Sequence, residues 1–201
     1  MQKKISLLVL ISIICCSCSI HGSFQGLYSY YQKTKEKKPG LLQHPETGVD
    51  ICSLPYPKDS PVVYVIKGTD LKKCIQKSKQ TVLYLWSPKC QSPVCYSPNI
   101  VANKCSNIGA DLFIVAEYYD SDLMSLKYSL KKPVYGIDTR YYGTDLTDKY
   151  VAKFLRDLDS TLVRSESHRY FYFVDGKFKA SYRSLDSLAK YETYNIGSAN
   201  N

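Results

Sequence analysis

From residue 61 onward, segments with strand patterns alternate with segments with helical patterns, and this order limits the folds open to the chain. Two runs rich in β-branched and apolar residues, 62–66 and 81–86, are predicted strands. A third predicted strand covers the apolar run 111–118. Strands that are separated by helices build a mainly parallel sheet with helices on both faces. We therefore predict an α/β fold.

Apolar spacing and capping signals predict helices between these strands. The first helix should be capped by Thr69 or Asp70. The predicted helices cover 70–77, a stretch from Pro93 or Pro98 to Asn107, 121–130, 148–158 and 185–191.

Three further strands are expected after the parallel core. A short one covers 134–137, and the runs 169–174 and 177–182 flank the pair Asp175-Gly176. An Asp-Gly pair between two strand patterns is a strong signal for a β-hairpin. The complete order predicts a three-layer α/β/α domain whose central mixed sheet ends in an antiparallel hairpin.

The first 17 residues have the pattern of an export signal. Lysines precede an apolar run, 5–14, that is short for a membrane span. The small residue before Cys18 resembles the lipidation site of bacterial lipoproteins, with Cys16 as another acceptor left open. An ordinary cleaved signal without lipid is the alternative. We expect residues 1–17 to be removed and acyl chains on Cys18 to anchor the protein to a membrane.

Residues 18–60 are predicted to form a lipid-anchored tether and an irregular lead-in, because Gly, Pro, Ser and Lys are scattered through them without a period. The lysine cluster at 33–38 would lie beside anionic head groups. No nucleic-acid partner is expected despite the formal charge of +9, because export removes that partner and no recognition motif is present. The domain itself should span 61–192, and residues 193–201 should form a flexible tail.

Tyrosine is unusually common, with 19 in 201 residues. Its ring packs while its hydroxyl stays in water, so this composition suits a modest core and amphipathic surfaces. We interpret the excess as compositional bias rather than as a dedicated binding surface.

Residues 61–192 resemble the thioredoxin-like superfamily, in particular its membrane-anchored bacterial lipoproteins. The resemblance is carried by the stretch Trp86-Ser-Pro-Lys-Cys90 after a strand, by Pro98 in the following helix, and by the terminal hairpin FYFVDGKF before a helix. It implies a thioredoxin-like fold and thiol–disulfide exchange, with the thiols or disulfides of exported proteins as partners and with no cofactor.

The same resemblance assigns catalytic roles to two cysteines. In that family a cysteine at the start of a helix is the nucleophile, because the helix N-terminus stabilises its thiolate, and a second cysteine resolves the mixed disulfide. These would be Cys90 and Cys95, separated here by four residues rather than the usual two. Either the chain bulges before the helix and the pair can close, or Pro93 takes the second position and Cys95 lies inside the helix.

His168 stands where the family has a cis-proline that faces the active cysteine. The resemblance therefore implies that Trp86, Pro93 and His168 face the substrate. A histidine opposite two cysteines also suits copper, as in the copper-delivery proteins of this fold. Cys90, Cys95 and His168 are thus an alternative copper-binding set, and a surface histidine bonded to water is the plainer interpretation.

The pairing of the other cysteines is left open by the sequence. Cys74 and Cys105 lie on two predicted helices, and Cys52 lies in the lead-in. A Cys74–Cys105 bridge is one option, and a buried inert thiol is the other for Cys105. Without the signal and Cys18, five cysteines remain, so at least one is unpaired or pairs between chains.

Three functional hypotheses follow. The first is a lipid-anchored thiol–disulfide oxidoreductase that uses Cys90 and Cys95, the second is a copper chaperone, and the third is a non-catalytic binding module. Export would place the protein in the cell envelope, facing the periplasm or the exterior. Ser19 lacks the acidic character of an inner-membrane retention signal, which favours the outer membrane.

Overall fold

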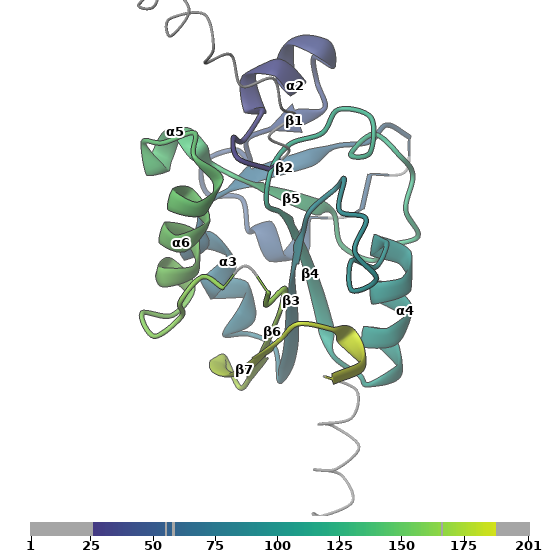
Figure 1. Ribbon diagram of the computed structural model, residues 1–201, viewed down its shortest axis with the longest axis vertical. Helices are drawn as coiled ribbons and strands as arrows, with labels where there is room; N and C mark the ends of the chain where they lie inside the picture. The colour runs from purple at the N-terminus through teal and green to yellow at the C-terminus, as the bar shows by residue number, and fades with distance from the viewer. Residues whose placement is uncertain (1–25, 55, 58, 166, 188–201) are drawn as a thin grey trace, which may run out of the picture.

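The computed structural model of the chain describes residues 26–54, 56–57, 59–165 and 167–187 (Figure 1). Within these residues seven strands form one sheet in the order β1-β2-β5-β4-β3-β6-β7. The neighbouring pairs β1-β2, β2-β5, β5-β4 and β4-β3 are parallel, whereas β6 is antiparallel to both β3 and β7. The strands are β1 (Leu42–Gln43), β2 (Val63–Ile66), β3 (Gln80–Trp86), β4 (Asp111–Ala116), β5 (Val134–Ile137), β6 (Tyr170–Val174) and β7 (Lys177–Tyr182).

Helices cover both faces of this sheet. Figure 1 shows α3 and α6 on one side and α4 on the other. Side chains alternate along β3, so Leu83 and Leu85 join the core under α3 and α6, while Tyr84 and Trp86 join the core under α4. The helices are α2 (Tyr31–Lys37), α3 (Gly68–Ile75), α4 (Pro98–Asn107), α5 (Thr139–Tyr142) and α6 (Thr147–Leu158), with a 3₁₀ turn η1 (Ile51–Ser53). The predicted three-layer α/β/α class with a mixed sheet and a terminal hairpin is confirmed.

Most predicted elements lie within a few residues of their expected bounds. Helix α3 starts slightly earlier than predicted, and Asp70 is its third residue, where its carboxylate accepts the Lys67 N–H at 3.4 Å. The hairpin turn is formed by Asp175 and Gly176, whose φ values of 49° and 73° fit a turn that needs two left-handed residues. Residues 185–187 are helical, and the rest of the predicted helix 185–191 lies outside the described residues.

Part of the predicted irregular lead-in is folded into the domain. Strand β1 pairs in parallel with β2, and Leu41 and Leu42 are buried against the sheet. The lysine cluster begins on α2, where Lys37 forms an ion pair of 2.8 Å with Asp122. The described part of the domain therefore begins before residue 61, because the lead-in supplies the apolar side chains that cover one end of the sheet.

The prediction of a helix at 121–130 is wrong, because side chains and distant residues take the backbone donors. The Asp120 carboxylate accepts the N–H groups of residues 122 and 123. Farther along, the Tyr128 N–H donates to the Tyr56 hydroxyl at 2.8 Å, and the Ser129 N–H donates to the Asn99 side chain at 2.7 Å. These bonds replace the regular helical ladder with a series of turns. Within the described residues no helix is both long and apolar enough to cross a membrane.

Many tyrosines are core residues whose hydroxyls donate to backbone carbonyls of loops and strand ends. The hydroxyl groups of these tyrosines bond to the protein rather than to water. Part of the tyrosine excess therefore serves to attach loops to the sheet by hydrogen bonds. The hydroxyl donors and their acceptor residues are Tyr84 to Tyr96, Tyr119 to Ile137, Tyr135 to Ile51, Tyr150 to Glu117 and Tyr170 to Val94.

Candidate functional site

Cys90 and Cys95 form a disulfide in the loop 87–97, which joins β3 to α4. Their Cα atoms are 5.9 Å apart, an ordinary separation for a disulfide. Both cysteines are half-buried, and the residues 91–93 between them are exposed. The loop leaves the sheet at the carboxyl end of β3, the edge at which open α/β sheets usually hold their ligands. The disulfide therefore lies beside an exposed loop tip at the ligand-binding edge of the sheet.

Both cysteines precede α4, which begins at Pro98. The structure thus has a bulge before the helix, and the expectation that Cys90 starts the helix is wrong. Each cysteine instead closes its own turn: the Cys90 N–H donates to the Ser87 carbonyl at 3.0 Å, and the Cys95 N–H donates to the Ser92 carbonyl at 2.9 Å. Cys90 therefore precedes the N-terminus of α4 in the chain and forms no part of the helix.

The three residues predicted to face a substrate lie in different settings. Pro93 is exposed at the tip of the disulfide loop. Trp86 is only 4% exposed and packs edge-on against Tyr128, with ring centroids 5.7 Å apart. That placement corrects the prediction for Trp86, because strand alternation points it into the α4 core. His168 is half-buried just before β6, where its Nδ1 and the Ser181 hydroxyl are 2.7 Å apart.

The alternative copper set is not assembled in this structure. Among the described residues, the His, Cys, Asp and Glu side chains whose ligand atoms converge within 4.8 Å are Asp50, Cys52 and Cys74, and not Cys90, Cys95 and His168. Two members of the converging group are themselves joined in a disulfide. A disulfide sulfur is not the thiolate that a soft metal requires.

A charged cluster lies at the carboxyl ends of β3 and β4, beside the start of the disulfide loop. Glu117 is 7% exposed, and its carboxylate accepts bonds from Arg164 at 2.8 Å and from Arg169 at 2.9 Å. The Ser87 hydroxyl bonds the same carboxylate, and it accepts a bond from Arg169 at 2.6 Å. Arg164 also pairs with Asp148 at 2.8 Å. A buried carboxylate held by two arginines couples β4, β6 and the first residue of the loop.

The sequence interpretation missed this cluster. Glu117 directly follows a buried strand, and neighbouring parallel strands bring their carboxyl ends to one edge of the sheet. The acidic residue at the carboxyl end of β4 is the sequence signal that could have indicated a polar site there. Its arginine partners come from distant segments, so their approach depends on the tertiary fold.

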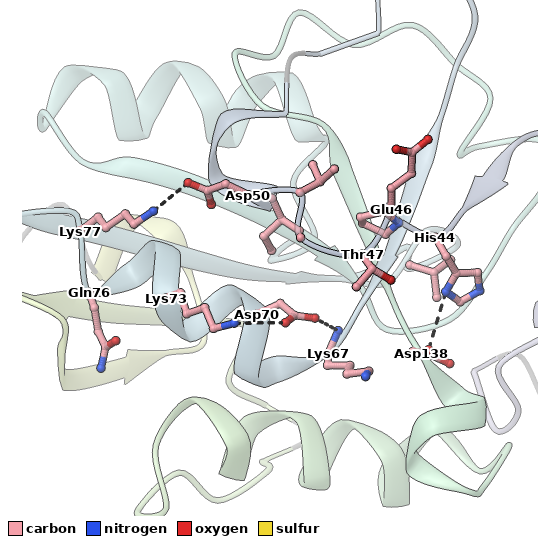
Figure 2. Close-up of a pocket in the computed structure, with 15 residues that line it drawn as sticks. His44, Glu46, Thr47, Asp50, Lys67, Asp70, Lys73, Gln76, Lys77 and Asp138 are labelled. Atoms are coloured by element: carbon pink, nitrogen blue, oxygen red, sulfur yellow. Dashed lines mark hydrogen bonds and ion pairs between the residues drawn. The ribbon is translucent and has the colours of Figure 1, made fainter.

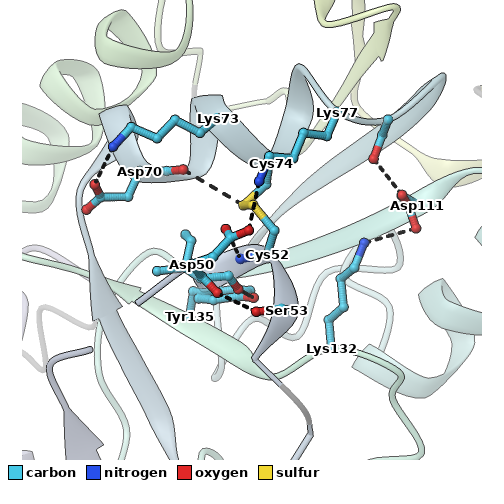
Figure 3. Close-up of a disulfide and its surroundings, with 12 residues drawn as sticks. Asp50, Cys52, Ser53, Asp70, Lys73, Cys74, Lys77, Asp111, Lys132 and Tyr135 are labelled. Carbon is cyan, nitrogen blue, oxygen red and sulfur yellow. Dashed lines mark hydrogen bonds and ion pairs between the residues drawn. A yellow bond between two sulfur atoms is a disulfide. The ribbon is translucent and has the colours of Figure 1, made fainter. Parts of the chain in front are cut away.

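The second disulfide, Cys52–Cys74, joins η1 to α3, and its Cα atoms are 5.2 Å apart (Figure 3). Cys74 is 1% exposed in the core under α3. Asp50 lies beside the bridge, where its carboxylate accepts the Cys52 N–H at 3.1 Å and a lysine ammonium, Lys77 Nζ, at 2.7 Å. The hydrogen bond from Lys77 is the main reason that the pKa of Asp50 lies below its usual value.

Cys105 remains a free, fully buried thiol on α4. Of the options left open by the sequence, the structure therefore contains the buried thiol and not a bridge to Cys74. Burial raises the pKa of Cys105 to about 12, so the thiol stays protonated and unreactive at neutral pH.

A cavity of about 890 Å³ lies between the lead-in segment 44–51 and α3 (Figure 2). Many of its charged side chains pair with each other: Lys73 with Asp70 at 3.9 Å, and Lys77 with Asp50 at 2.7 Å. Its lining includes no residue of the disulfide loop. Its size makes it a candidate ligand site, but no cysteine of either disulfide is among its lining residues.

No protein-family model and no curated protein matches this chain. Its function therefore has to be inferred from the residues and their geometry.

Proposed function

We propose that this protein is an exported, lipid-anchored thiol–disulfide oxidoreductase of the cell envelope, which acts through Cys90 and Cys95 on the thiols or disulfides of exported proteins. The observation that carries this proposal is a disulfide in an exposed loop at the carboxyl edge of the sheet. A bridge over so short a loop adds only about 2 kcal/mol of stability by the chain-entropy relation. An accessible bond with a small structural role suits reversible exchange.

The arrangement of elements supports a thioredoxin-like architecture for this proposal. Strands β3 and β4 are parallel neighbours joined through α4, and the cysteines lie between β3 and that helix. Strand β6 pairs antiparallel with the other edge of β3 and continues into β7. This is the order of a parallel core followed by an antiparallel hairpin that the resemblance implies.

The exchange itself is a pair of balanced thiolate substitutions. A substrate thiolate attacks the Cys90 sulfur, the Cys90–Cys95 bond breaks, and the Cys95 thiolate leaves and takes up a proton. The second substrate thiolate then attacks the substrate sulfur of the mixed disulfide and releases Cys90. The substrate gains a disulfide, and its two electrons and two protons remain on the cysteine pair. A second disulfide compound then reoxidises the pair. The same steps in reverse reduce a substrate disulfide and leave the pair oxidised, and a dithiol compound then returns the pair to its reduced form.

Reactivity must come from access and loop geometry, because Cys90 does not lie at a helix N-terminus. Loop residues 91–93 are exposed, so the sulfurs can be approached from the side of the solvent. The Cys95 backbone is already in the position that closes the bridge, which favours rapid resolution of a mixed disulfide.

A trapping experiment tests the proposal. The variant Cys95→Ser, incubated with a disulfide-bonded peptide, should accumulate a mixed disulfide on Cys90 that mass spectrometry detects. Cys90→Ser should neither form this adduct nor exchange disulfides, and Cys105→Ser should exchange like the wild type. The proposal is wrong if wild type and Cys90→Ser are equally inert. If excess dithiol does not reduce the Cys90–Cys95 disulfide, the disulfide is structural and the protein is a non-catalytic binding module instead.

A further inference from the structure

Two buried tyrosines form a platform under the disulfide loop. Tyr84 on β3 and Tyr170 on β6 are direct partners in the antiparallel ladder, and both are 0% exposed. Their rings stack with centroids 4.8 Å apart and planes at 6°. Because both side chains leave the sheet on the side of α4, their hydroxyls reach the backbone that leads into that helix.

These hydroxyls hold the two residues that flank Cys95. The Tyr84 hydroxyl donates to the carbonyl of Tyr96 at 2.8 Å, and the Tyr170 hydroxyl donates to the carbonyl of Val94 at 3.3 Å. The backbone on each side of the cysteine is thus bonded to the centre of the sheet. Burial raises the pKa of Tyr84 to about 12, so its hydroxyl remains a donor throughout the neutral range.

The other cysteine is also preceded by an anchored residue. The Lys89 N–H donates to the Tyr118 hydroxyl at 2.9 Å, and the Lys89 ammonium pairs with Asp120 at 2.9 Å. Two residues earlier, Ser87 is bonded to Arg169 and to the buried carboxylate of the charged cluster. The loop is therefore tied to the sheet on both sides of an exposed tip at 91–93.

We propose that Tyr84 and Tyr170 are positioning residues that set the redox equilibrium of the Cys90–Cys95 pair. The anchors keep the ends of the loop in place in the dithiol as well as in the disulfide. Closing the bridge then orders little additional backbone, which favours the disulfide. This inference rests on the proposed function, since it concerns the equilibrium on which exchange by the same pair depends.

The test measures the dithiol–disulfide equilibrium of the full chain in glutathione redox buffers. Protein disulfide and two glutathione thiols convert to protein dithiol and glutathione disulfide, and alkylation followed by mass spectrometry counts each form at Cys90 and Cys95. Tyr84→Phe and Tyr170→Phe should each lower the constant for bridge formation by about threefold to tenfold, the range of one ordinary hydrogen bond. The double variant should lower the constant at least as far as the larger single effect, because stacked residues that hold one segment do not act independently.

Tyr135→Phe is the matched control. It removes a buried tyrosine hydroxyl that also donates to a loop carbonyl, that of Ile51 at 3.1 Å, away from the disulfide loop. Thermal unfolding followed by circular dichroism shows whether the variants share the same small loss of stability. Shifts of the equilibrium in the Tyr84 and Tyr170 variants that do not exceed that of Tyr135→Phe overturn the inference.

Two further outcomes are separated by the same assay. If the Tyr84 and Tyr170 variants fail to fold, Tyr118→Phe releases the Lys89 backbone on the other side of the loop and should shift the equilibrium in the same direction. An unchanged equilibrium in that variant overturns the inference. If the wild-type pair stays oxidised at every glutathione ratio, the same comparison of variants in dithiothreitol buffers decides the positioning role. The proposed exchange function fails separately, if wild type and Cys90→Ser are equally inert in the trapping experiment.

Discussion

The two disulfides of this protein have the same chemistry in opposite settings. The cysteines of Cys52–Cys74 are 22 positions apart in the chain, and one of them, Cys74, is buried in the core. Cys90–Cys95 spans five positions and lies in a loop with an exposed tip. Chain-entropy arguments assign about 3 kcal/mol to the longer loop and about 2 kcal/mol to the shorter one. Loop length and burial make the first bridge suited to holding the lead-in on α3 and the second suited to exchange.

The non-covalent supports of the two bridges also differ. Asp50 and Lys77 make an exposed ion pair beside Cys52–Cys74, and exposed pairs contribute little to stability. The loop of Cys90–Cys95 begins at a buried cluster around Glu117 and ends on the buried tyrosine platform. Cys90–Cys95, the disulfide that contributes less stability, therefore has the more buried hydrogen-bond network around it. On this account the loop keeps its shape when the disulfide is reduced.

The largest effect is expected for Glu117→Leu. Arg164 and Arg169 would lose their shared carboxylate in a poorly hydrated site, and breaking such a pair should lower the free energy of unfolding by about 4 kcal/mol. Urea unfolding measures this change. Glu36→Leu, at an exposed position on α2, is the control and should change little. Equal values for the two variants would show that the buried ion pairs of the cluster do not stabilise the fold.

Smaller losses in the free energy of unfolding are expected when each disulfide is removed, and the two losses should differ. Cys52→Ala with Cys74→Ala should lower the free energy of unfolding by about 3 kcal/mol, and Cys90→Ala with Cys95→Ala by about 2 kcal/mol, because the shorter loop restricts the unfolded chain less. Both double variants can be measured in one urea series under oxidising conditions. The reverse order would contradict the division between a structural bridge and an exchange bridge.

The smallest effect concerns Cys105, which belongs to neither bridge. Burial raises the pKa of its thiol from 9.0 to about 12, so the folded protein keeps a proton that the unfolded chain releases. The stability from this thiol is complete below pH 9.0 and is lost as the pH rises toward 12. At neutral pH we expect slow alkylation of Cys105 in the folded protein and fast alkylation in urea. Rapid labelling without denaturant would contradict its burial.

Periodic patterns were sufficient to predict most of the sheet and its helices. Strands β3 and β4 are long apolar runs, and α6 has a regular apolar face, so local sequence and tertiary structure agree there. The short strand β1 has only two residues, and α2 follows Tyr30 in a left-handed conformation with φ of 56°. Neither leaves a periodic signal, so periodicity alone predicts an irregular lead-in.

The sequence singled out Cys90 and Cys95, which the structure joins in a disulfide, but it did not predict the geometry of their loop. The spacing of Cys90 and Cys95 left two registers open, and only the start of α4 at Pro98 selects between them. The burial of Trp86 follows from alternation along β3, which the resemblance did not take into account. The pairing of Cys52 with Cys74 depends on how the lead-in packs on α3, and the sequence between two cysteines 22 positions apart does not encode this.

A graded reduction of the two disulfides in one sample tests the central claim most directly. The oxidised chain is equilibrated over a series of glutathione ratios, quenched by alkylation and mapped by peptide mass spectrometry. The account predicts that Cys90–Cys95 opens at ratios that leave Cys52–Cys74 fully closed. If Cys52–Cys74 opens first, or if the two bridges open together while the fold is intact, the exposed bridge is not the exchange site.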